Sequence, residues 1–161
     1  AKPKPTRWRS ASAASAASSS RPRVPPRVWL ATVFGEVACA TMDAVRPTVL
    51  IVDDHEAFRT SARALLEVDG FDVIGESGDG DEALRAVADL RPQVVLLDVQ
   101  LPGLDGFAVA ARLAETVDPP AVVLISSRDA AAYGPRLRDT PSRGFISKGE
   151  LSGKALAALI D

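Results

Sequence analysis

Four consecutive apolar residues, at positions 94–97, lead directly into an acidic residue, Asp98. Pro92 precedes this run, and Pro102-Gly103 follows it closely. A short apolar run between turn-forming residues is typical of a parallel strand that is buried on both faces. Open parallel sheets bind their ligands at the carboxyl ends of their strands. We therefore expect a central strand that presents Asp98 at the edge of a sheet where chemistry takes place.

Similar apolar runs recur after position 45 and alternate with segments of helical periodicity. Strands are predicted over 48–52, 71–76, 94–97, 121–125 and 144–147, and helices over 55–67, 81–90, from 105 or 106 onward, and 150–160. Segment 129–139 predicts only a short or irregular fourth helix, because Gly134-Pro135 interrupts it. Alternation with short connections implies parallel strands and right-handed crossovers. The prediction is a three-layer α/β domain.

Residues 1–44 differ in composition from the rest of the chain. Positions 1–27 consist mostly of Ala, Ser, Pro and basic residues, and such a stretch buries too little apolar surface to offset the entropy of ordering. We expect a disordered, low-complexity extension over 1–44 and one domain over 45–161. Met42 is the only methionine and precedes the first strand. A further hypothesis therefore places the native start at Met42 and treats residues 1–41 as not native.

The charge is also unevenly distributed. Residues 1–41 carry seven basic residues and one acid, whereas residues 42–161 carry twelve basic and twenty acidic residues. An acidic domain argues against a nucleic-acid-binding surface, because phosphate contacts need basic side chains. No apolar run is long enough to span a membrane, and the single cysteine excludes an internal disulfide, which suits a reducing compartment. We expect a cytoplasmic protein that does not contact membrane.

Four of the five predicted strands end in a side chain capable of chemistry. Asp53 and Asp54 follow the first strand, Asp98 the third, Ser126 the fourth and Lys148 the fifth. Because parallel strands share one carboxyl edge, we expect these side chains to lie together. Crowded carboxylates repel one another and need a cation, and an oxygen-only site open to water suits Mg²⁺. Asp54 and Asp98 are expected to bind Mg²⁺ directly, and Asp53 to orient a water.

The same arrangement predicts a phosphoryl acceptor. Asp98 is placed to be the nucleophile, and the backbone carbonyl of Gln100 is expected to complete the Mg²⁺ site. Lys148 supplies charge to one phosphoryl oxygen, and the Ser126 hydroxyl donates a hydrogen bond to another. Each residue alone has an ordinary explanation, such as helix capping for the aspartates. His55 is expected to be a first-turn helix residue rather than a ligand or a base.

These motifs resemble the response-regulator receiver domain of two-component signalling. The resemblance covers about 47–160 and is carried by segments 49–55, 96–106, 124–127 and 144–148. It implies a flavodoxin-like (βα)5 fold with strand order 2-1-3-4-5. It also implies that a sensor histidine kinase phosphorylates Asp98 with Mg²⁺ present, and that Phe145 is an aromatic switch residue beside helix 4. The implied module is no enzyme beyond self-phosphorylation and self-dephosphorylation, and homodimerisation is compatible with it.

Some features depart from the family or leave alternatives open. Gly149 follows Lys148 where many receivers have proline, so the way this loop is held is not predicted. The motifs look most like the subgroup that usually carries a helix-turn-helix output domain, but the sequence ends at Asp161; it is a stand-alone receiver or a truncated one, and DNA binding is not carried over to it. A pseudo-receiver that acts as a phosphorylation-independent interaction domain is the main alternative. A Mg²⁺-dependent phosphohydrolase is disfavoured, because no acid follows Asp98 closely.

Overall fold

The computed structural model describes residues 45–161, which contain a parallel five-stranded sheet of order β2-β1-β3-β4-β5. This order and the alternation of strands with helices confirm the predicted flavodoxin-like fold. The predicted extension over 1–44, with its proposed start at Met42, lies outside the described residues. The strands are β1 (Thr48–Val52), β2 (Asp72–Ser77), β3 (Val94–Asp98), β4 (Ala121–Ser126) and β5 (Gly144–Ser147).

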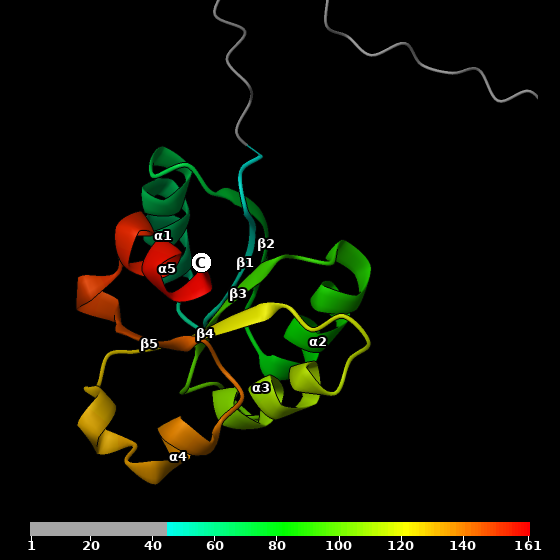
Figure 1. Ribbon diagram of the computed structural model, residues 1–161, viewed down its shortest axis with the longest axis vertical. Helices are drawn as coiled ribbons and strands as arrows, with labels where there is room; N and C mark the ends of the chain where they lie inside the picture. The colour runs from blue at the N-terminus through cyan, green and yellow to red at the C-terminus, as the bar shows by residue number, and fades with distance from the viewer. Residues whose placement is uncertain (1–44) are drawn as a thin grey trace, which may run out of the picture. The chain divides into compact units, whose positions relative to one another are not determined.

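Helices cover both faces of the sheet (Figure 1), with α1 and α5 on one face and α2 and α3 on the other. Alternate residues of one strand serve the two faces: Ile51 packs toward α1 and α5, and Leu50 toward α2 and α3. This is why the central strands are continuously apolar. No helix within residues 45–161 is long and apolar enough to cross a membrane. The helices are α1 (Glu56–Val68), α2 (Gly80–Leu90), α3 (Gly106–Ala114), α4 (Pro135–Asp139) and α5 (Gly153–Ile160).

The region between β4 and β5 is irregular, as the sequence predicts. A 3₁₀ turn, η1 (Ala130–Ala132), is followed by α4, which has only five residues. Between them Gly134 adopts a positive φ of 52°, a conformation that glycine adopts at little cost. Pro135 then starts α4, where its missing N–H costs nothing. The predicted short fourth helix is therefore confirmed.

The last helix begins later than the predicted residue 150. Residues Lys148–Glu150 form a separate 3₁₀ turn, η2, without a cis peptide bond. The Ser152 hydroxyl accepts the Ala155 N–H at 3.1 Å, which caps α5. The Asp69 carboxylate accepts the Gly153 N–H at 2.6 Å. These two hydrogen bonds set the start of α5 at Gly153, so the predicted start was wrong by three residues.

Charged side chains connect α1 to β2 through Glu76. Arg63 Nε lies 2.6 Å from Glu76 Oε1, and Arg59 Nε lies 3.2 Å from Glu76 Oε2. The hydrogen bond from Arg63 is the largest cause that lowers the pKa of Glu76, against the opposing effect of burial. A carboxyl group whose pKa is lower in the folded state stabilises the fold above its unfolded pKa. This stabilisation is lost as the pH falls through the folded pKa.

We expect Glu76→Gln to lower the free energy of unfolding at neutral pH by about 1 kcal/mol or less, because Glu76 is partly exposed. The difference from wild type should shrink as the pH falls through the lowered pKa of Glu76, because the wild-type carboxylate then becomes protonated. Urea unfolding at a series of pH values measures this. Glu115→Gln, at an exposed position, is the matched control. A difference that persists unchanged in acid contradicts the prediction.

Candidate functional site

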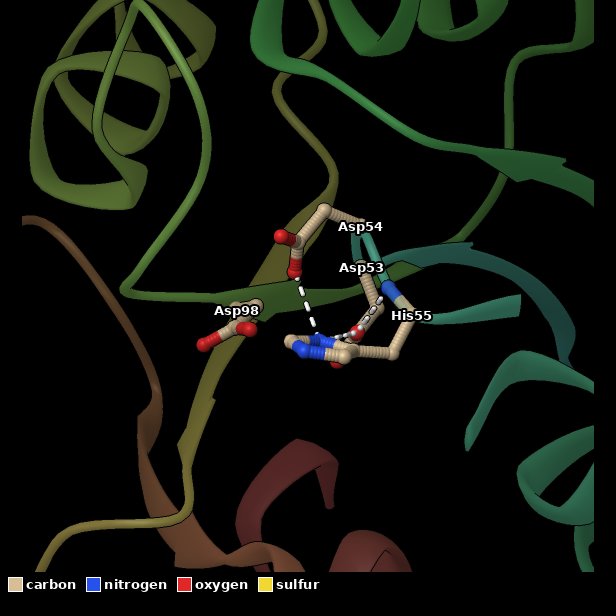
Figure 2. Close-up of side chains that lie close together, drawn as sticks. All are labelled: Asp53, Asp54, His55 and Asp98. Atoms are coloured by element: carbon tan, nitrogen blue, oxygen red, sulfur yellow. Dashed lines mark hydrogen bonds and ion pairs between the residues drawn. The ribbon is translucent and has the colours of Figure 1, made fainter. Parts of the chain in front are cut away.

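Three carboxylates meet at the carboxyl edge of the sheet (Figure 2). Asp53 and Asp54 follow β1, and Asp98 is the last residue of the adjacent strand β3. The side chains of Asp53 and Asp98 are 0% and 3% exposed, whereas that of Asp54 is 37% exposed. Ligand atoms of these three residues and of His55 all lie within 4.8 Å of one another. The cluster is thus buried at its base and open to solvent at Asp54.

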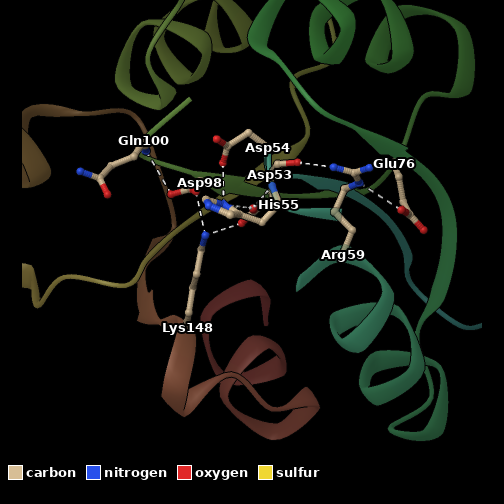
Figure 3. A network of polar contacts seen from close by, with 8 residues as sticks. All are labelled: Asp53, Asp54, His55, Arg59, Glu76, Asp98, Gln100 and Lys148. Carbon is tan, nitrogen blue, oxygen red and sulfur yellow. Dashed lines mark hydrogen bonds and ion pairs between the residues drawn. The ribbon is translucent and has the colours of Figure 1, made fainter. Parts of the chain in front are cut away.

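Lys148 reaches this cluster from the end of β5 (Figure 3). Its Nζ lies 2.5 Å from Asp53 Oδ2 and 2.8 Å from Asp98 Oδ2. Burial acts to lower the pKa of Lys148, but the hydrogen bonds to Asp53 and Asp98 outweigh it and raise the pKa above its ordinary value. Lys148 is therefore a charged ammonium. Because one ammonium faces three carboxylates, the site keeps a negative balance that attracts a cation.

The pKa of Asp98 is set by its burial and by its hydrogen bonds to Lys148 and Gln100. Burial raises the pKa of Asp98 above its ordinary value, and the hydrogen bond from Lys148 opposes this effect. The backbone N–H of Gln100 donates to Asp98 Oδ1 at 3.0 Å, while Lys148 Nζ donates to Oδ2. Both carboxylate oxygens of Asp98 are thus held in place. The structure brings the Gln100 backbone beside Asp98, and a ligand role for its carbonyl stays a prediction.

His55 lies among the carboxylates, which the sequence analysis did not predict. It precedes α1 as the N-cap residue, and its backbone N–H donates to Asp53 Oδ1 at 2.8 Å. Its ring Nδ1 lies 2.8 Å from Asp54 Oδ1 and 3.3 Å from Asp53 Oδ1. The sequence feature that could have indicated this is that His55 directly follows Asp53-Asp54 in the chain. The ring is 70% exposed, so it covers only the solvent side of the acid pair.

The donor set fits a hard divalent cation. Asp53 Oδ2 is buried, and within residues 45–161 its partner is the Lys148 ammonium, 2.5 Å away. A carboxylate oxygen has two lone pairs, so one that contacts a single ammonium can accept a further ligand contact. Carboxylate oxygens near solvent are the ligands that Mg²⁺ favours. The acidic cluster of Asp53, Asp54 and Asp98 is therefore compatible with Mg²⁺ binding.

Ser126, at the end of β4, is fully buried, and its hydrogen bonds are to residues outside the acidic cluster. Its Oγ lies 2.5 Å from the Tyr133 hydroxyl and accepts the Arg128 N–H at 3.1 Å. Within residues 45–161, no hydrogen bond joins Ser126 to Asp98. The predicted phosphoryl contact is thus not preformed. Sequence reasoning missed Tyr133 because nothing in the spacing shows where a ring in an irregular segment will lie.

Comparison with known proteins gives matches to response regulators and their receiver domains. The profile of the response regulator receiver domain matches residues 49–160. The response regulator GacA of Pseudomonas viridiflava is 34% identical over 102 residues, which are 63% of this chain and 48% of GacA. The positive alginate biosynthesis regulatory protein of Pseudomonas aeruginosa is 47% identical over 83 residues, 50% of this chain and 34% of that protein. The chain spans about half the length of the first curated relatives it matches.

Solved structures agree with the sequence matches. The signal receiver domain of NarL from Mycobacterium tuberculosis has 32% sequence identity and a TM-score of 0.64. The match covers 71% of this chain and 96% of that domain. It therefore extends over nearly the whole NarL receiver domain.

Proposed function

The chain belongs to the response regulator receiver domain family, and from this we infer that Asp98 accepts a phosphoryl group from a sensor histidine kinase. The observation that carries the proposal is the meeting of the Asp53, Asp54 and Asp98 carboxylates with the Lys148 ammonium at one sheet edge. A strand-end carboxylate beside a buried ammonium and a cation site suits phosphoryl transfer, which depends on positioning and charge neutralisation.

In the proposed reaction, a carboxylate oxygen of Asp98 attacks phosphorus and forms a P–O bond. The P–N bond of the donor phosphohistidine breaks, and its electron pair stays on the imidazole nitrogen. Lys148 balances charge on one phosphoryl oxygen, and the Ser126 hydroxyl donates to another. Asp54, Asp98 and the Gln100 carbonyl would hold Mg²⁺ directly, and Asp53 would hold it by orienting a water. When bound, Mg²⁺ would neutralise charge on the carboxylates and on the incoming phosphoryl oxygens.

The proposed product is a signalling state rather than a released compound. Phosphorylation would change the surface around α4 and β5, where Phe145 occupies the predicted switch position and where a partner or a second copy would bind. We expect a cytoplasmic module, with any self-phosphorylation and self-dephosphorylation confined to Asp98. Its negative balance of charge over residues 42–161 speaks against DNA binding by this domain itself.

Incubation with acetyl phosphate and Mg²⁺, followed by intact mass measurement, tests the proposal. We expect the wild type to gain one labile phosphoryl group and Asp98→Asn to gain none, because the amide is a poor nucleophile. Asp72→Asn, at an exposed acid on the opposite edge of the sheet, is the matched control and should be labelled like wild type. Labelling should also fail when EDTA removes Mg²⁺. A wild type that is not labelled would favour the phosphorylation-independent pseudo-receiver.

A further inference from the structure

Tyr133 connects the end of β4 to the segment that leads into α4. It is the only tyrosine of the chain, and it directly follows η1. Its hydroxyl lies 2.5 Å from Ser126 Oγ. Its ring lies between two others, with its centroid 5.6 Å from that of Phe107 in α3 and 6.1 Å from that of Phe145 in β5. The ring is thus fixed on two sides while its hydroxyl reaches the site.

The hydrogen bonds of Ser126 all lead away from Asp98. A serine hydroxyl has one proton to donate and two lone pairs to accept with. Both partners of the Ser126 hydroxyl, the Tyr133 hydroxyl and the Arg128 N–H, belong to the segment after β4. The Asp98 oxygens are bonded to Lys148 and to the Gln100 N–H instead. The hydroxyl must therefore turn before it can meet a phosphoryl oxygen on Asp98.

We propose that Tyr133 is a positioning residue that holds the Ser126 hydroxyl in the resting state, in competition with the phosphoryl group on Asp98. This inference rests on the proposed function and adds a residue to it. A charged phosphoryl oxygen is a stronger acceptor than a neutral tyrosine hydroxyl. Phosphorylation therefore withdraws Ser126 from Tyr133, and the loss of this hydrogen bond frees the Tyr133 hydroxyl.

The segment between β4 and β5, which carries Tyr133, can rearrange when the Ser126–Tyr133 hydrogen bond is lost. Neither η1 nor α4 contains a fully buried residue, and Leu137 of α4 is only partly buried where it packs against the core, so a limited apolar contact opposes a rearrangement. Gly134, at φ 52°, follows Tyr133 directly and can act as a hinge. Arg136 provides another attachment, 2.9 Å from Asp105 Oδ2 and 4.4 Å from the centre of the Phe107 ring. Loss of the Ser126–Tyr133 hydrogen bond thus removes one of a small number of contacts that hold this segment.

Tyr133→Phe tests the competition, because it keeps the ring and removes only the hydroxyl. We expect the variant to be labelled by acetyl phosphate with Mg²⁺ about five-fold faster than wild type, the factor typical of one neutral hydrogen bond. In a Ser126→Ala background the same substitution should change the rate by much less, because no serine hydroxyl remains to be held. An unchanged or slower rate for Tyr133→Phe contradicts the proposal while leaving Asp98 phosphorylation intact. A wild type that is not labelled contradicts the proposed function itself.

A spectroscopic measurement reports on the contact independently of the labelling rate. Incorporation of 3-fluorotyrosine places one fluorine-labelled side chain in the chain, at Tyr133. We expect Ser126→Ala to shift its ¹⁹F resonance in the unphosphorylated protein. Phosphorylation of the wild type should shift the resonance toward the Ser126→Ala position. A resonance that responds to neither change overturns the proposal, because a ring with a purely structural role would behave in this way.

Discussion

Lys148→Ala is expected to lower the free energy of unfolding by about 3 kcal/mol at neutral pH, measured by urea unfolding without Mg²⁺. The ammonium is shared by Asp53 and Asp98, and the three side chains are 12%, 0% and 3% exposed. Removal of Lys148 leaves two buried carboxylates without their counter-charge, which costs more than the intact ion pairs contribute. Labelling by acetyl phosphate should fall severely in the same variant, because a phosphoryl oxygen loses its cation.

Two further measurements separate this effect from a general loss of stability. Asp53→Asn combined with Lys148→Ala should be more stable than Lys148→Ala alone, because one of the two unpaired charges is removed. Mg²⁺ should stabilise Lys148→Ala more than it stabilises wild type, since the cation takes over the role of the ammonium. Lys154→Ala, at an exposed position in α5, is the control and should stay within about 0.5 kcal/mol of wild type. Equal stability of the two lysine variants would contradict the prediction.

The arrangement of the strand ends could be predicted from the sequence because it follows from topology. β1, β3 and β4 are continuously apolar, since helices cover both faces of the sheet. A residue that ends a parallel strand must then lie at one edge, whatever its side-chain conformation. This is why Asp53, Asp98 and Lys148 could be expected to meet before any distance between them was known.

The partner of each side chain could not be predicted, because it depends on packing between elements that are far apart in sequence. Gly134-Pro135 predicts that no regular helix forms, but it does not say that the Tyr133 ring lies between Phe107 and Phe145. The start of α5 depends in part on a hydrogen bond from Gly153 to Asp69, which is 84 positions away. Local periodicity contains no information on either contact.

Gly106→Ala is expected to be destabilising by about 1–3 kcal/mol, although it adds a single methyl group. Gly106 is the first residue of α3 and packs directly on the end of β3. A Cβ there would lie 2.2 Å from the Asp98 backbone oxygen and 2.8 Å from the Val99 Cα. Both atoms are backbone, so relief requires the strand end to move. Urea unfolding and acetyl phosphate labelling measure the two consequences.

The position of Asp98 should therefore change together with stability, and the labelling rate of Gly106→Ala should fall. Gly78→Ala is the matched control, because a Cβ there meets its nearest atoms, in Arg59 and Glu82, at 3.9 Å. This is an ordinary van der Waals distance, so we expect the control to unfold and to be labelled like wild type. If Gly106→Ala matched Gly78→Ala in both measurements, close packing of α3 against β3 would not be what fixes Asp98. If only stability fell, the strand end would tolerate the shift and Asp98 would be positioned by Lys148 and the Gln100 N–H.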